Sequence, residues 1–387
     1  MSYNGPSIHQ STVTEDVVRP TQVEVDLSRL KENFTAIRDH VRPARIMPVL
    51  KANAYGHGLV RVAKLMEELG ADYLGVAVLE EGILLRQRGI KTPILVTGGI
   101  LGNQVPHFIG YDLTITASSV SKLDQIEEAA DKMDKPARVH LKIDTGMERL
   151  GVHYYSAESF LEKALSCRHV QVEGVFSHFA RSEETDLLYT RMQLERFLEV
   201  LSFYEKRSLD PPPLRHIANS GAILQLPESH LDMVRPGILL YGVYPSEKTQ
   251  RTVEVRPALT WKSKVVYFKV IRPDHPVGYG SKWRSDRPVR AVTVPVGYGD
   301  GYFRSMSHKA EVLIRGKRFP VVGAISMDQI VVNLGDGTAY NNDEVILIGE
   351  MKSGRIRCED LAEWAGTIPY EILTNINTRV PRIYRTG

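Results

Sequence analysis

Residues 139–149 read VHLKIDTGMER, a short apolar run followed directly by a polar segment that contains a glycine. The same plan recurs along the first 245 residues, where apolar runs alternate with amphipathic stretches. Runs that are apolar on successive residues are typical of parallel strands covered on both faces. These runs lie at 46–50, 73–78, 94–97, 113–116, 139–143, 172–176, 214–217 and 231–234.

The stretches between the runs have helical periodicity. Residues 60–69 and 118–133 are amphipathic, and a long helix is expected to begin near Leu187. Eight strands alternating with helices predict an α/β fold with an N-terminal (β/α)8 TIM barrel. An open, doubly wound sheet is the alternative that the pattern leaves.

After residue 245 the sequence pattern changes, and it predicts a C-terminal, mostly antiparallel β domain. Its β-rich runs are separated by turn signals such as Gly-Asp-Gly at 335–337, and one helix is expected at 358–365. We therefore expect a flexible tail at 1–18, a barrel domain at 19–245 and a β domain at 246–387. An alternating strand near 21–27 is a candidate to pair with the β domain. The β-rich runs lie at 261–271, 289–296, 310–314, 319–324, 329–334 and 344–348.

Composition excludes several classes of protein. With 49 basic and 46 acidic residues, the net charge of +3 gives no reason to expect a nucleic-acid partner. No apolar run approaches the ~20 residues of a membrane span, and the first residues lack the basic and apolar pattern of a signal peptide, so we expect neither. Two cysteines favour a reducing compartment, so we expect a cytoplasmic protein. The 12 histidines are scattered, and no metal site is predicted.

Polar residues gather where the predicted barrel strands end. Lys51 follows the first run, Lys142 lies in the fifth and His178 follows the sixth. The segments 219–221 and 235–238 follow the seventh and eighth runs. In a barrel these positions share the rim at the carboxyl ends of the strands, where active sites are built.

Lys51 is the strongest single candidate for a catalytic residue. A lysine that closes a buried strand has a lowered pKa, and its free amine can form a Schiff base with an aldehyde cofactor. An isolated lysine at a strand end more often extends its amine to solvent. However, Ser220 and the amides of Gly237 and Ile238 follow strands seven and eight, where barrel enzymes commonly bind phosphate. A lysine opposite a phosphate site points to pyridoxal 5'-phosphate.

Motifs along most of the chain resemble those of bacterial alanine racemases, a pyridoxal-phosphate family of fold type III. The resemblance implies a cytoplasmic homodimeric isomerase that interconverts L- and D-alanine and supplies D-alanine for peptidoglycan in the cell wall. The motifs are RPT (19–21), KANAYGHG (51–58), DTGMERLG (144–151), SHFA (177–180), NSGA (219–222), RPGI (235–238), LYG (240–242), GYGDG (297–301), SMD (326–328), PYE (369–371) and RVPR (379–382).

The resemblance also implies roles for single residues. Lys51 would bind the cofactor and act as one catalytic base, and Tyr298 of the partner subunit would be the second. A tyrosine between glycines can instead be a turn residue with its ring packed on a sheet, and Tyr279, in VGYG at 277–280, shows that this setting occurs twice. Lys142, carbamylated in some members of the family, would orient Arg149. Cofactor contacts are implied for Lys51, Tyr55, Arg149, His178, Ser220, Arg235, Gly237, Ile238 and Tyr370, and substrate contacts for Arg149 and Met327, with Asp328 in support.

Two other functions stay open at this point. A related racemase of serine, lysine or several amino acids would differ in the size of its pocket. A non-catalytic pyridoxal-phosphate carrier built on a bare barrel would need neither residues 246–387 nor Tyr298.

Overall fold

The computed structural model describes residues 18–386. These residues form two compact units. The barrel unit comprises Arg29–Ala54 and Gly58–Arg256, and the β unit comprises 18–28, Tyr55–His57 and 257–386. All but the last residue of the expected tail at 1–18 lies outside the described residues.

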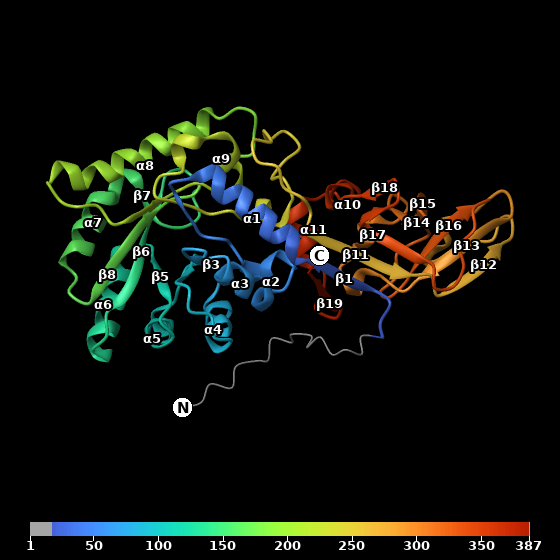
Figure 1. The fold of residues 1–387 in the computed structure, drawn as a ribbon, viewed down its shortest axis with the longest axis horizontal. Helices are drawn as coiled ribbons and strands as arrows, with labels where there is room; N and C mark the ends of the chain where they lie inside the picture. The colour runs from blue at the N-terminus through green and yellow to red at the C-terminus, as the bar shows by residue number, and fades with distance from the viewer. Residues whose placement is uncertain (1–17, 387) are drawn as a thin grey trace. The chain divides into compact units, whose positions relative to one another are not determined.

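The barrel unit is built on a curved sheet of parallel strands in the order β3-β4-β5-β6-β8-β9 (Figure 1). Strands β2 and β10 pair in parallel. The main chain just before β10 is bonded to β9, where Asp232 N donates to Arg215 O (3.1 Å). The main chain after β2 is bonded to β3, where Leu50 N donates to Gly75 O (2.7 Å). The ring of eight parallel segments therefore closes, and the predicted (β/α)8 barrel is confirmed. The strands are β2 (Arg45–Ile46), β3 (Leu74–Val76), β4 (Ile94–Val96), β5 (Thr114–Ala117), β6 (Ala137–Asp144), β8 (Val170–Phe176), β9 (Leu214–His216) and β10 (Met233–Val234), with β7 (Val152–His153) paired to β6.

Helices follow the strands, and Figure 1 shows α4 to α8 along the outer side of the curved sheet. The strands are buried on both faces, which explains why their sequences are apolar on successive residues. Met47, Tyr73, Leu95, Leu214 and Met233, from five segments of the ring, pack together in its core. The helices are α1 (Leu27–Val41), α3 (Leu59–Glu68), α4 (Leu79–Gln87), α5 (Val105–Gly110), α6 (Val120–Met133), α7 (Ala157–Ser166), α8 (Leu188–Lys206) and α9 (Ser220–Gln225).

The β unit contains one continuous, mostly antiparallel sheet in the order β12-β13-β16-β15-β14-β17-β11-β1-β19, with β18 paired to β17. Strand β1 pairs antiparallel with β11 and parallel with β19. The strands are β1 (Gln22–Asp26), β11 (Leu259–Lys264), β12 (Tyr267–Ile271), β13 (Val289–Val294), β14 (Glu311–Ile314), β15 (Lys317–Val322), β16 (Ile330–Gly335), β17 (Glu344–Met351), β18 (Gly354–Ile356) and β19 (Arg382–Arg385).

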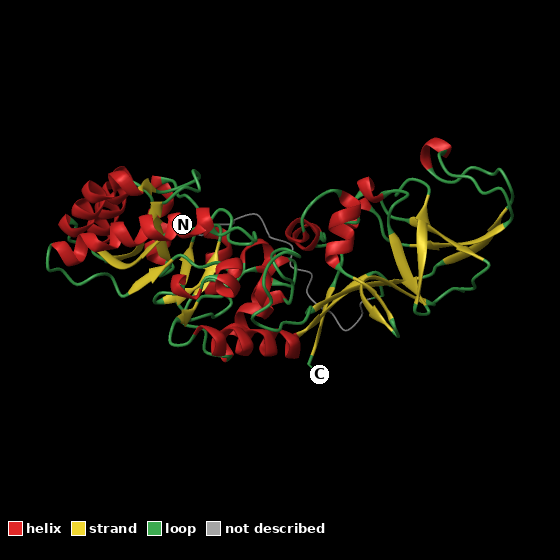
Figure 2. Cartoon of the chain, turned by 90° about the horizontal axis from the view of Figure 1, so that it is seen from above, coloured by secondary structure: helices red, strands yellow, loops and turns green. Residues whose placement is uncertain are grey.

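Two features of the β unit differ from the sequence pattern. The apolar run at 261–271 is divided into β11 and β12, because Val265 N donates to Asp343 O whereas Val266 N donates to Thr293 O. The chain thus changes its partner strand between these two residues. Helix α10 (Cys358–Ala365) occupies the expected range, and α11 (Pro369–Asn375) follows it. Figure 2 shows that the remainder of the unit is mostly strand and loop.

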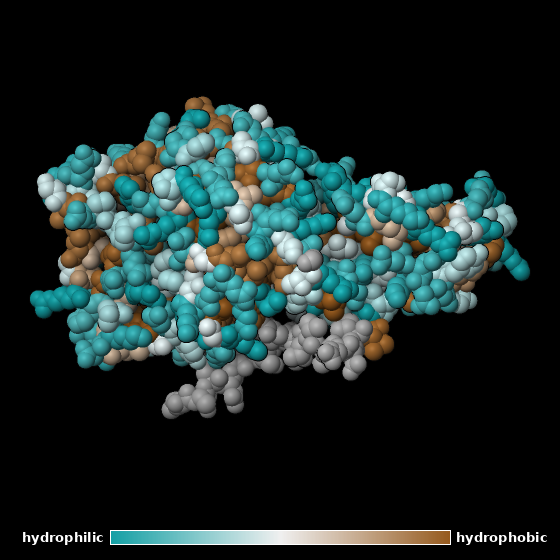
Figure 3. Space-filling model, in the orientation of Figure 1, coloured by the Kyte–Doolittle hydropathy of each residue, from teal (hydrophilic) through white to brown (hydrophobic). Residues whose placement is uncertain are grey.

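The surface is mixed in polarity. On the face drawn in Figure 3, hydrophobic residues lie in separate groups among hydrophilic ones. Within residues 18–386, none of the helices combines the length and the apolar character that a membrane crossing requires.

Candidate active site

Lys51 comes directly after the first segment of the barrel ring and is half-buried. Burial lowers the pKa of its amine, and the positive charges of Arg149 and Arg235 lower it further. The carboxylate of Glu81 opposes this shift. The net effect favours a neutral amine with a free lone pair, which is the state that a nucleophile or a proton acceptor requires.

The main chain after Lys51 forms a left-handed turn, α2 (Lys51–Tyr55). Ala52, Asn53, Ala54 and Tyr55 all have φ between 50° and 56°. Each such residue with a Cβ costs roughly 1–2 kcal/mol relative to the right-handed form. Local hydrogen bonds support the turn: Ala52 N donates to Glu81 Oε1 (2.7 Å), and the Oδ1 atom of Asn53 accepts from Leu59 N (2.9 Å). Strain held in place by its surroundings is a mark of a functional segment.

Arg235, at the end of β10, is the hub of the polar groups at the barrel rim. Its side chain is buried, and Nη2 lies 3.0 Å from Nδ1 of His178 while Nη1 lies 2.8 Å from Nδ1 of His216. A guanidinium only donates hydrogen bonds, so both Nδ1 atoms must be acceptors. Both histidines are therefore neutral with the proton on Nε2. Burial, followed by the charge of Arg235, holds the pKa of each imidazole far below its usual value.

The tautomer of a third histidine, His140, follows from its contact with His216. Nε2 of His216 lies 2.8 Å from Nδ1 of His140, on β6. Because Nε2 of His216 carries a proton, it donates a hydrogen bond to Nδ1 of His140. His140 is therefore neutral, with its own proton on Nε2. Burial lowers the pKa of His140 to about 3. Arg235 thus sets the tautomers of three histidines.

Lys142 lies on β6 and is almost wholly buried. Its Nζ lies 4.9 Å from the centre of the Phe176 ring. Burial and the charge of Arg235 lower the pKa of Lys142 to about 7, although Asp144 opposes the shift. Asp144 accepts hydrogen bonds from the main-chain amides of residues 146–149, so it shapes the loop that carries Arg149.

Ser220 begins helix α9 and meets the segment after β10. Its Oγ accepts from Gly237 N (2.9 Å) and from Leu239 N (3.4 Å). The hydroxyl hydrogen is then left to donate, and a hydroxyl polarised by two amides is a strong donor to an anion. The structure thus brings together the expected Ser220 and Gly237, and Ile238 follows as a buried residue. The Gly237 amide, however, points at Ser220.

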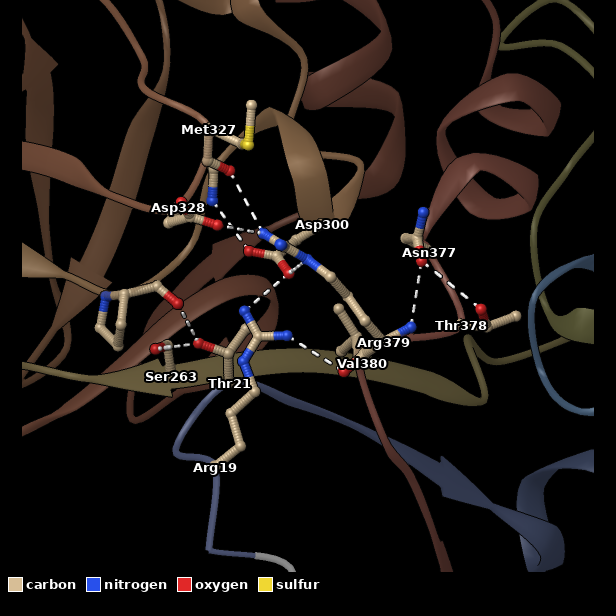
Figure 4. A network of polar contacts seen from close by, with 12 residues as sticks. Arg19, Thr21, Ser263, Asp300, Met327, Asp328, Asn377, Thr378, Arg379 and Val380 are labelled. Atoms are coloured by element: carbon tan, nitrogen blue, oxygen red, sulfur yellow. Dashed lines mark hydrogen bonds and ion pairs between the residues drawn. The ribbon is translucent and has the colours of Figure 1, made fainter. Parts of the chain in front are cut away.

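The β unit carries a second polar centre, drawn in Figure 4. The carboxylate of Asp300 is fully buried and accepts from Arg19 Nη2 (2.6 Å) and Arg379 Nε (2.7 Å) through Oδ1. Its Oδ2 accepts from Gly297 N (3.0 Å). Arg379 also donates from Nη2 to Asp328 Oδ1 (2.8 Å) and to Met327 O (3.3 Å). Asp300 and Arg379 therefore fasten the turn before Tyr298 to the segment that contains Met327.

Tyr298 and the residue before Tyr279 both approach the main chain of residues 324–326, just before Met327. Tyr298 N donates to Ser326 O (3.0 Å), and a Cβ added to Gly278 would lie 3.1 Å from Ala324 N. Tyr298 is 41% exposed, whereas Tyr279 is 70% exposed. Tyr279 lies between Gly278 and Gly280, both at positive φ, in a loop closed by a hydrogen bond from Val277 N to Trp283 O (3.0 Å). Both phenols thus reach the surface of the β unit, and Tyr279 is the more exposed.

Tyr55 and Tyr370, both expected to contact phosphate, come together in the β unit. Their ring centres are 6.1 Å apart. Tyr55 is buried, and burial raises the pKa of its phenol. The Tyr55 hydroxyl is consequently expected to act as a neutral donor.

Several residues of these two centres escaped the sequence interpretation. His140 and His216 lie within runs that were read only as strands, and their signal is a polar residue in an otherwise apolar strand. Arg19, Asp300 and Arg379 lie within quoted motifs, but their ion pairs join segments up to 281 residues apart, which no local pattern reveals.

Both units match family models for alanine racemases. The model described as alanine racemase, N-terminal domain, matches residues 25–245, and the one described as alanine racemase, C-terminal domain, matches residues 258–384. Among curated proteins, alanine racemase 2 of Caldanaerobacter subterraneus is 42% identical over 95% of this chain and 96% of its own length. The alanine racemase of Carboxydothermus hydrogenoformans is also 42% identical, over 95% of this chain and all of its own length.

Solved structures agree with the sequence relatives. Alanine racemase from Clostridium difficile superposes with a TM-score of 0.90 at 38% identity, covering 96% of this chain and 97% of its own. Alanine racemase from Streptomyces coelicolor gives 0.92 at 36% identity, covering 97% and 100%. A Clostridium difficile alanine racemase has also been solved in complex with cycloserine. The chain therefore belongs to the alanine racemase family.

Proposed function

We propose that this protein is a pyridoxal-phosphate-dependent alanine racemase that interconverts L- and D-alanine by two bases on opposite faces of the substrate. The observation that carries the proposal is the membership of the full barrel and β units in the alanine racemase family. The product D-alanine would serve peptidoglycan synthesis in the cytoplasm. A non-catalytic carrier would not need the β unit, and the chain has one.

The barrel unit's residues fit an anionic cofactor. The groups that shift the pKa values of Lys51, Lys142 and His178 within the described residues are four basic side chains and two carboxylates. Of the basic side chains, Arg235 is both buried and charged at neutral pH, and buried positive charge is costly unless an anion accompanies it. The phosphate of pyridoxal phosphate supplies such an anion, and the polarised hydroxyl of Ser220 is a suitable donor to it. The cations are Lys51, Lys142, Arg149 and Arg235, and the carboxylates are Glu81 and Asp144.

Pyridoxal phosphate, when bound, withdraws electrons from the substrate and so acidifies its Cα hydrogen. Nζ of Lys51 would hold the cofactor and would accept or return the Cα proton on one face. Arg235 would face the pyridine nitrogen and, as a donor only, would leave that nitrogen unprotonated. His178, kept neutral by Arg235, would support the second base. With a pKa of about 7, the amine of Lys142 is neutral in about half of the molecules at pH 7, and the neutral amine is the form that carbamylation requires.

The second base would be a tyrosine of the partner subunit in a homodimer. The family resemblance assigns this role to Tyr298. Exposure favours Tyr279, because a phenol that serves the site of another chain must protrude from its own. Met327 and Arg149 would bind the substrate carboxylate, with Asp328 held in place by Arg379.

The activity is tested by a coupled assay for D-alanine, run beside L-serine, L-lysine and other L-amino acids. We expect alanine to be racemised fastest. Faster racemisation of serine or lysine would replace the substrate assignment, and failure to racemise any amino acid would refute the function.

The shared site is tested by mixing two inactive variants after dissociation. Lys51→Ala is combined with Tyr298→Phe in one experiment and with Tyr279→Phe in another. If the tyrosine acts in the partner's site, random pairing restores about a quarter of the sites. The tyrosine whose mixture recovers activity is the second base, and no recovery in either mixture would refute a base from the partner.

A further inference from the structure

Arg382 is the first residue of β19 and its side chain is only 4% exposed. In the part of the chain that the structure describes, its guanidinium donates four hydrogen bonds, all to main-chain carbonyls. Nε donates to Gly56 O (3.0 Å), and Nη2 donates to Ile376 O (2.6 Å). Nη1 donates to Asn377 O (2.6 Å) and Val380 O (2.7 Å). One side chain therefore joins two segments that are more than 300 residues apart in the sequence.

Burying a guanidinium without a carboxylate partner is unfavourable for the free energy of folding. Burial lowers the pKa of Arg382 to about 10, so the group is still charged at neutral pH. Two of its acceptors, Ile376 and Asn377, directly follow α11, where the carbonyls at a helix end carry partial negative charge. An apolar side chain would fill this space at lower cost. The guanidinium is thus suited to fixing where Gly56 lies relative to α11.

Gly56 is held from its other side by α11. Its φ is +81°, and a Cβ at this position would lie 2.1 Å from Leu373 O. Only a glycine allows this approach. Gly56 is therefore enclosed between Arg382 and Leu373, and Tyr55, the preceding residue, meets the ring of Tyr370 on the same helix.

We propose that Arg382 is a positioning residue for cofactor binding: it holds the Tyr55–Gly56 segment against α11 and so sets the spacing of the Tyr55 and Tyr370 hydroxyls that receive the phosphate. This inference rests on the proposed function, since it assumes that the two tyrosines bind pyridoxal phosphate.

The first test measures cofactor affinity of the full chain by equilibrium dialysis with pyridoxal phosphate. Arg382→Met should bind about tenfold to a hundredfold more weakly than wild type, as is common when a supporting hydrogen bond behind a ligand is lost. Arg382→Lys should fall between them, because one amine can replace only part of the four bonds. The control is Leu347→Ala, which opens a cavity in buried β17 of the same unit. It should lower the unfolding temperature without changing the affinity.

A double-mutant cycle separates positioning from general destabilisation. Tyr55→Phe is made in wild type and in Arg382→Lys, which retains a cation and serves even if Arg382→Met does not fold. If Arg382 acts through Tyr55, removing the hydroxyl costs less affinity in the lysine variant. The inference is overturned if removal of the Tyr55 hydroxyl costs the same affinity in both backgrounds. It is also overturned if Arg382→Lys and Arg382→Met bind pyridoxal phosphate as tightly as wild type, or if Leu347→Ala loses as much affinity as Arg382→Met. Failure of wild type to bind pyridoxal phosphate would instead overturn the proposed function.

Discussion

The two polar centres of the molecule handle charge in opposite ways. In the barrel unit, Lys142 and Arg235 are buried and face mainly other cations and neutral histidines. In the β unit, the buried Asp300 is bonded to both Arg19 and Arg379, and Arg379 reaches Asp328 as well. In the barrel centre the basic side chains outnumber the carboxylates, whereas in the β centre the two are balanced.

The barrel centre therefore has the charges of a ligand-binding site, whereas the β centre holds parts of the main chain in position. A buried cation such as Arg235, without a carboxylate bonded to it, disfavours the empty state and favours the entry of an anion. Paired charges instead rigidify the main chain that they join, here the turn before Tyr298 and the Met327 segment. The comparison therefore predicts that changes in the barrel centre alter ligand binding and pH dependence, whereas changes in the β centre alter stability and substrate affinity.

The largest expected effect comes from the barrel centre. Lys51→Ala should lower kcat/KM for alanine by at least about a thousandfold, because it removes both the cofactor attachment and one base. Borohydride reduction followed by peptide mapping should place pyridoxal phosphate on the peptide that contains Lys51. The exposed Lys64, on α3, provides the control, and Lys64→Ala should have unchanged activity. Labelling of a different lysine would contradict the assignment.

The second prediction concerns the pH dependence of stability and uses the cofactor-free protein in buffer without carbon dioxide. The pKa of Lys142 is about 7 in the folded state, against about 10.4 for an unfolded lysine. Between these values only the unfolded state binds the proton, so stability rises with pH across this window and is flat below it.

Lys142→Met lacks this contribution and isolates it. The difference in unfolding free energy between wild type and the variant should shift by about 3 kcal/mol in favour of wild type from pH 6.5 to pH 9.5. Urea denaturation at the two pH values measures the shift. Parallel behaviour of the two proteins would mean that Lys142 is not a buried, uncompensated cation.

The third prediction tests the β centre. Asp300→Asn removes the carboxylate that Arg19 and Arg379 share and leaves Arg379 paired with Asp328 alone. It should destabilise the protein by about 2 kcal/mol, less than the loss of a fully buried pair, because both arginines are partly exposed. KM for alanine should rise more than kcat falls, since the Met327 segment loses its fastening. Asp336, whose side chain is 84% exposed, supplies the control. Asp336→Asn should change neither quantity, and equal effects of both variants would remove the special role of Asp300.

Much of the fold follows from periodicity alone. The barrel strands are apolar on successive residues because helices and core cover both faces, so the runs at 94–97 and 139–143 coincide with β4 and part of β6. The division of 261–271 was not predictable, because it depends on a change of partner strand at Val265 and Val266. Closure of the ring through the short pair β2 and β10 likewise depends on contacts between distant segments.

The candidate site is predictable to a smaller extent. Lys51, His178 and Arg235 follow from their positions at strand ends, and the structure joins Arg235 to His178 directly. The tautomers of His140 and His216 could not be predicted, because they depend on which atoms face a guanidinium. The left-handed turn after Lys51 could not be predicted either, because alanines such as Ala52 and Ala54 ordinarily favour a right-handed helix.

The smallest predicted effect compares the same substitution in these two conformations. Ala52 has φ 53° and ψ 55°, where a Cβ costs roughly 1–2 kcal/mol that glycine avoids. Glycine also loses more entropy on folding, by about 0.5–1 kcal/mol, so Ala52→Gly should raise the unfolding free energy by about 0.5 kcal/mol. Ala129 lies in the right-handed helix α6, and Ala129→Gly should lower it by about 1 kcal/mol. Urea denaturation of both variants measures these changes. Destabilisation by Ala52→Gly equal to that by Ala129→Gly would mean that the turn after Lys51 is not held in a strained, left-handed form.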